Sequence, residues 1–144
     1  ILAECGTDMT RWPTSKHFTS WLTLAPGSKI SGGKVLSSRT RRSRNRATTL
    51  FRLAAVSVGR TSTALGAFFR RLAARVGKAK AVTATARKIA VLFYNLLRHG
   101  TAYVDAGANY YEERYRKRTV ESLRRRADAL GYALVEAAPA SRAS

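Results

Sequence analysis

A single serine stands at the start of a short Gly-Gly-Lys run. Ser31 precedes Gly32, Gly33 and Lys34 within residues 26–46, a stretch with few apolar residues. Glycines lack a Cβ, so the backbone of a partner can approach closely at this turn. A hydroxyl in such a setting suits phosphate anchoring or phosphoryl transfer. The alternative is a flexible, solvated basic loop in which the serine is incidental.

A cluster of arginines follows the serine. It consists of Arg39, Arg41, Arg42, Arg44 and Arg46. Each guanidinium is a planar fork of donors that matches the oxygens of a phosphate. Basic residues also recur along the whole chain with few acids to offset them. We therefore predict that this loop binds nucleic acid through these arginines together with Lys29, Gly32, Gly33, Lys34 and Asn45.

The charge balance of the whole chain points to the same class of partner. The 144 residues carry 27 Lys and Arg against 8 Asp and Glu, a net charge of +19. Such self-repulsion opposes compaction unless a polyanion neutralises it, and nucleic acid is the first candidate. An anionic membrane surface is the second. The apolar runs are too short and interrupted to span a bilayer, so we expect no membrane partner.

The residues that bind metals in proteins are sparse and scattered. Cys5 is the one cysteine, which fits a reducing, cytosolic protein. No acids stand at the spacing of a two-metal site, so we predict no cofactor in this chain. Glu112 and Glu113 precede Arg116 and Lys117 by four residues, which predicts ion pairs on a helix surface.

Helical periodicity organises most of the chain. Residues 1–6 read as the end of a helix, and further helices are predicted over residues 14–25, 45–59, 62–76, 78–99 and 110–130. The helix at 78–99 is the most apolar and is placed at the core. The fold class is mainly α: a compact domain of about five helices with a long basic Gly/Ser/Arg loop. A short C-terminal strand over residues 132–135 is an option.

Three tyrosines are interleaved with charge near the start of the last helix. Tyr110, Tyr111 and Tyr115 have a spacing that places them on neighbouring parts of one helix. They could stack on nucleic-acid bases. The favoured interpretation is that they belong to the core, with their hydroxyls at its rim.

The order of these features resembles the C-terminal, serine-bearing domain of insertion-sequence transposases of the one-ten type. That family includes the Piv invertase and the bridge-RNA-guided recombinases. The resemblance lies in residues 2–34, 42–61 and 96–132. The matching positions are Glu4, Gly6, Asp8, Trp12, Phe18, Pro26, Ser31, Gly32 and Asn45.

The resemblance implies a transposase that cuts and joins DNA with Ser31 as the nucleophile. It also implies an RNase-H-like domain that binds Mg²⁺ through acidic residues, expected before Ile1, and a structured guide RNA and a homo-oligomer as partners. Residues 1–135 would form the serine-bearing domain, truncated at its N-terminus, and residues 136–144 a disordered tail. The expected location is the prokaryotic cytoplasm, with the nucleoid. The alternative function is a non-catalytic, basic helical module that binds RNA or DNA.

Overall fold

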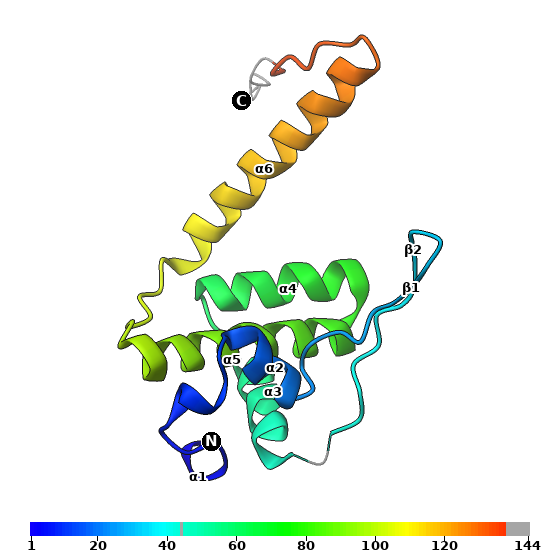
Figure 1. Cartoon of the computed structure of the whole chain (residues 1–144). Coiled ribbons are helices and arrows are strands. Elements are labelled where there is room, and N and C mark those ends of the chain that lie inside the picture. The colour runs from blue at the N-terminus through cyan, green and yellow to red at the C-terminus, as the bar shows by residue number, and fades with distance from the viewer. Residues whose placement is uncertain (44, 138–144) are drawn as a thin grey trace.

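The protein is a helical bundle with one small β-hairpin and one helix that extends beyond the bundle (Figure 1). The computed structural model describes residues 1–43 and 45–137; Arg44 and most of the predicted tail lie outside them. The elements are α1 (Leu2–Cys5), the 3-10 helix η1 (Met9–Arg11), α2 (Ser15–Trp21), β1 (Lys29–Ser31), β2 (Lys34–Ser37), α3 (Arg46–Val58), α4 (Ala64–Val76), α5 (Lys78–His99) and α6 (Gly107–Ala129). The predicted mainly helical class is confirmed.

The strand predicted at residues 132–135 was wrong. This segment forms neither helix nor strand, and the two strands of the described residues lie at 29–37 instead. A strand needs a partner for its backbone groups, and the only described sheet is the two-stranded hairpin. The segment 132–135 therefore stays irregular.

The core is built around one phenylalanine. The Phe18 side chain is fully buried, and its ring centroid lies 5.0 Å from Trp12, 6.4 Å from Phe51 and 6.1 Å from Phe93. These rings come from the segment before α2, from α3 and from α5. The Tyr94 hydroxyl donates a buried hydrogen bond of 2.8 Å to the Trp12 carbonyl. The aromatic cluster thus joins residues that are far apart in the sequence.

Helix α5 is central, as its apolar composition predicts. It packs against α2, α3 and α4. The residues it buries include Ala81, Ala86 and Ala90, which are fully shielded from solvent. Small side chains let neighbouring helices approach closely. The larger Ile89 of α5 lies at the edge of the core, where it is partly buried.

The turn between α3 and α4 depends on close backbone approach. A Cβ on Gly66 would lie 2.3 Å from the Thr61 carbonyl oxygen, and one on Gly59 would lie 2.6 Å from the Phe69 ring. The Arg70 guanidinium donates to the carbonyls of Gly59 (3.1 Å) and Thr61 (2.7 Å). Arg70 is exposed, and its guanidinium supplies donors to carbonyls that follow the end of α3.

Helix α6 crosses α4 and then leaves the bundle (Figure 1). It buries no residue fully. Its contact with α4 is made by Arg71, whose guanidinium lies 3.6 Å from the centre of the Tyr115 ring and pairs with the Glu112 carboxylate. The sequence predicts that Glu112 pairs with a cation of its own helix. That expectation was wrong, because α6 lies against α4 and Glu112 pairs with Arg71.

The tyrosines of α6 lie at this crossing rather than in the core. Tyr111 and Tyr115 are half-buried, and Tyr110 is 48% exposed. The prediction that all three are core residues was therefore wrong. A helix that touches only one neighbour cannot bury its apolar stripe on every side.

The link from α5 to α6 is fixed by one carboxylate. Asp105 Oδ1 accepts hydrogen bonds from the Ala64 amide (3.0 Å) and the Tyr103 hydroxyl (2.7 Å), and Oδ2 accepts from the Gly107 amide (3.2 Å). The bond from Tyr103 is the main cause that lowers the pKa of Asp105. Desolvation, followed by this bond, raises the pKa of Tyr103 to about 12. Asp105 thus ties the start of α4 to the start of α6.

Candidate nucleic-acid interface

The serine lies in a tight β-hairpin. Strands β1 and β2 are antiparallel, with Ile30 opposite Val35 and Ser31 opposite Lys34. Gly32 and Gly33 form the turn, with φ of 54° and 75°. Two central residues with positive φ define a type I′ turn, which matches the twist of the strands. The sequence analysis predicted an irregular loop here and missed a real signal: two glycines between short runs with β-branched residues.

Ser31 is exposed and faces a positive charge. It is the last residue of β1 and stands directly opposite Lys34 across the hairpin. Side chains directly opposite each other project from the same face of a hairpin, whereas the next residues along each strand project from the other face. The Lys34 ammonium therefore shares a face with the Ser31 hydroxyl. A phosphate that reaches Ser31 would meet this charge.

The hairpin stands apart from the helical bundle (Figure 1). Neither strand packs against another described element. Its larger apolar side chains are open to solvent: Ile30 is 64% exposed, Val35 61% and Leu36 68%. One backbone hydrogen bond of 3.0 Å, from the Gly27 amide to the Arg39 carbonyl, closes its base. A partner can therefore reach both faces of the hairpin.

The predicted phosphate-binding cations are free for a partner. The exposed set comprises Lys29, Lys34, Arg39, Arg41 and Arg42. Within residues 1–43 and 45–137, the ion pairs are Arg46 with Glu4 and Arg71 with Glu112, so none of the exposed set is neutralised there. Arg44, the remaining predicted contact in this run, lies outside the described residues.

The end of the basic loop is anchored to the bundle. The Asn45 side-chain oxygen accepts a hydrogen bond of 2.9 Å from the Ala47 amide, so Asn45 caps α3 as its sequence position predicts. The Thr48 hydroxyl donates a buried bond of 2.6 Å to the Leu22 carbonyl. Arg46 Nε lies 3.7 Å from Glu4 Oε1, and the Arg46 side chain is 85% exposed. Such a solvated pair is weak, so Arg46 remains available to a phosphate.

The described residues do not form a metal site. No three His, Cys, Asp or Glu side chains among them lie close enough to hold an ion. The resemblance assigns the Mg²⁺ centre to a separate RNase-H-like domain, and no step below runs through a metal held by these residues. Cys5 is buried in the core, and burial raises the pKa of its thiol. It is a packing residue rather than a ligand.

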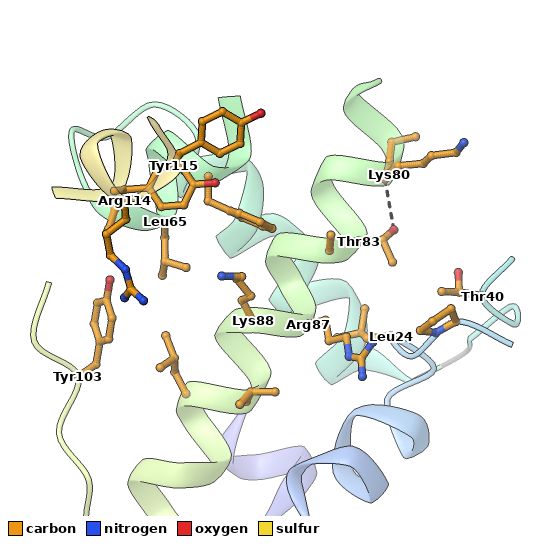
Figure 2. A pocket seen from close by; sticks show the side chains of 18 of the residues that line it. Leu24, Thr40, Leu65, Lys80, Thr83, Arg87, Lys88, Tyr103, Arg114 and Tyr115 are labelled. Atoms are coloured by element: carbon orange, nitrogen blue, oxygen red, sulfur yellow. Dashed lines mark hydrogen bonds between the residues drawn. The ribbon is translucent and has the colours of Figure 1, made fainter. Parts of the chain in front are cut away.

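A second basic surface was missed by the sequence analysis. A groove lies between α4, α5, α6 and the segment after β2 (Figure 2). Lys80, Arg87 and Lys88 contribute to it from α5. Their spacing of i, i+7 and i+8 places them on one helix face, a signal that the sequence contains. It was overlooked because α5 was treated only as a core helix.

The part of the chain that the structure describes has no helix with the length and apolar character needed to cross a membrane.

Comparison with known proteins gave one match. Residues 1–70, which include the hairpin and its serine, match the family model described as "Transposase IS116/IS110/IS902 family". No curated protein and no solved structure matches the chain.

Proposed function

We propose that this chain is the DNA-binding part of a recombinase in which Ser31 attacks DNA; the match of residues 1–70 to the IS116/IS110/IS902 transposase family supports this proposal. The observation that carries this proposal is the hairpin. It presents an exposed serine beside a two-glycine turn and opposite a lysine. Such a protein would act on DNA in the prokaryotic cytoplasm, in association with the nucleoid.

The proposed step is a phosphoryl transfer to the serine. Ser31 Oγ forms a bond to a backbone phosphorus, and the bond from that phosphorus to one sugar oxygen breaks. The serine proton is lost to a base, and the sugar oxygen takes up a proton to become a hydroxyl. Attack by a hydroxyl of another DNA end reverses these changes, restores Ser31 and joins the new strands. The charge of Lys34 would stabilise the phosphoryl oxygens as negative charge develops.

The exposed arginines have a different role in this proposal. A serine hydroxyl is a poor nucleophile until its surroundings activate it. Ser31 is exposed and stands opposite Lys34, and within the described residues it makes no hydrogen bond to a carboxylate or an imidazole. We propose that activation comes from the metal-dependent domain that the resemblance implies. Arg39, Arg41 and Arg42 would hold the duplex so that the reacting phosphate stays at the hairpin.

The test compares two serines in the complete transposase. Ser31→Ala should abolish recombination and leave DNA affinity unchanged, because the hydroxyl is lost and the cations remain. Ser28→Ala is the matched control: Ser28 lies just before β1 and is also exposed, and its variant should recombine normally. A covalent protein–DNA adduct, trapped and mapped by mass spectrometry, should lie on Ser31.

Two results would contradict the proposal. Full recombination by Ser31→Ala would show that Ser31 is not the nucleophile, and so would an adduct mapped to another residue. If Ser31→Ala retained full activity and this chain still bound nucleic acid, the non-catalytic module would be the better description.

A further inference from the structure

The groove beside the hairpin has a volume of about 1220 Å³. Helix α5 forms its floor, α4 and α6 form one side, and the segment after β2 forms the other. Figure 2 shows Lys88 near its middle, with Tyr103 and Arg114 on one side of it and Arg87 and Thr40 on the other. Leu65 and other apolar side chains also line it. It is therefore a surface that combines apolar and basic character.

The charges in the groove are all of one sign. Its lining includes no carboxylate, and its cations are Arg39, Lys80, Arg87, Lys88, Arg114 and Arg118. Desolvation, followed by the positive charge of Arg118, lowers the pKa of Lys88. Such a gathering of cations with no counter-charge favours a ligand that carries several negative charges along its length.

The groove also offers aromatic faces. Tyr103 and Tyr110 line it and are 47% and 48% exposed. Cations lie close over two other rings, at 4.2 Å from the centre of Phe68 (Lys88) and 3.6 Å from that of Tyr115 (Arg71). The Arg114 guanidinium lies farther from the centre of the Tyr110 ring, at 5.6 Å. Bases stack on exposed tyrosine rings when they are not already stacked in a duplex. The combination of cations and open rings therefore fits an unpaired strand better than a duplex.

One end of the groove is continuous with the hairpin that carries the serine. Ser37, Ser38, Arg39 and Thr40 line that end. Ser37 is the last residue of β2, and Arg39 closes the base of the hairpin through its bond with Gly27. A strand that leaves Ser31 can therefore follow β2 into the groove without crossing the bundle.

From these features we infer that the groove binds an unpaired segment of the DNA strand next to the one that Ser31 attacks. Its phosphates lie against the groove cations, and its bases stack on Tyr103 and Tyr110. The choice of DNA rests on the proposed function, whereas binding of an unpaired strand rests on the groove alone. A strand held in this groove would be kept from re-pairing with its complement.

The experiment measures binding by the full chain with fluorescence anisotropy at several salt concentrations. The probes are an oligo-dT strand of about ten nucleotides, a duplex, and an oligo-U strand of the same length. Tyr110→Ala should weaken oligo-dT binding roughly five- to 150-fold, the effect of losing one stacked base. Lys80→Gln with Arg87→Gln should lower the oligo-dT salt slope by about 0.7 for each phosphate that these side chains no longer neutralise. Neither variant should weaken duplex binding.

Controls separate this inference from the proposed function. Arg124→Gln with Arg126→Gln removes the same charge from exposed positions of α6 outside the groove and should leave oligo-dT binding unchanged. The double variant Arg41→Gln with Arg42→Gln removes two positive charges from the basic loop that follows the hairpin, and it should weaken duplex binding. Circular dichroism checks that each variant is folded, and the two groove variants test the inference independently.

Three results would overturn the inference. One is that the groove variants weaken oligo-dT binding no more than the α6 control variant does. Another is equal weakening of duplex and single-strand binding, which would make the groove a general basic surface. The third is tighter binding of oligo-U with the same dependence on the groove, which would assign it to RNA. Failure of the hairpin variants to change duplex binding would instead count against the proposed function.

Discussion

The Gly32 position allows the hairpin to be disturbed without disturbing the bundle. Gly32 has a φ of 54°, and an added Cβ would meet no heavy atom within 4 Å. The cost of Gly32→Val is therefore conformational, about 1–2 kcal/mol for a side chain in the left-handed region. This cost should lower the ratio of closed to open hairpin roughly five- to 30-fold. Isolated two-stranded hairpins are marginally stable, so little else can offset it.

Gly32→Asn is the matched control. Asparagine tolerates this conformation, and Asn-Gly is a preferred pair for a type I′ turn. Amide hydrogen exchange over residues 29–37 should accelerate in the valine variant towards the rate of an unstructured chain and stay near wild type in the asparagine variant. The melting temperature should not change in either, because the strands contact no other described element. Under the proposed function, recombination should fall with the valine variant alone.

Either of two outcomes would refute this reasoning. Equal exchange in the valine and wild-type chains would mean that the turn does not hold the hairpin. A lower melting temperature in the valine variant would mean that the hairpin supports the bundle.

The remaining predictions concern charge, the core and pH. Arg41→Gln with Arg42→Gln should lower the slope of log affinity for duplex DNA against log salt by about 0.9 per phosphate contact, and an unchanged slope in a salt titration would contradict those contacts. Tyr94→Phe should lower the free energy of unfolding in urea by roughly 1–3 kcal/mol, because the buried Trp12 carbonyl loses its donor; Tyr132→Phe, at a 72% exposed position, should change nothing. The folded-state pKa of Asp105 is lowered, so its stabilisation is present above its ordinary pKa of about 4 and is lost as pH falls through the lowered value. Asp105→Asn should therefore reduce the acid sensitivity of the urea midpoint, and an unaltered pH profile would argue against the role of this carboxylate.

Local patterns in the sequence were sufficient for the helices and their caps. The apolar spacing of α5 predicts its central place, and Asn45 caps α3 as its position suggests. The hairpin was predictable too, because two glycines between runs with β-branched residues favour a type I′ turn. It was missed because the charge of the surrounding stretch favoured a disordered loop.

Contacts between distant segments could not be predicted in the same way. Arg71 and Glu112 lie on different helices, and nothing in the spacing of either helix shows that α6 crosses α4 at this point. The groove depends on that crossing, since α6 supplies Arg114 and Tyr110 while α5 supplies Lys88. For the candidate site, the sequence identified Ser31 and its cations, whereas the pairing of Ser31 with Lys34 required the register of the strands.

The aromatic core has a consequence for how the chain folds during synthesis. The family match ends at residue 70, within α4. Phe18 and Phe51, however, pack against Phe93. The Trp12 carbonyl accepts its hydrogen bond from Tyr94, which lies 82 residues later in the chain. A nascent chain that has reached residue 70 lacks Phe93 and Tyr94, so their partners in this cluster stay incompletely buried until α5 is made. The aromatic core can therefore form as one cooperative unit only after α5 has been synthesised. An exchange of this region between this chain and members of the matched family should transfer residues through His99, not only residues 1–70.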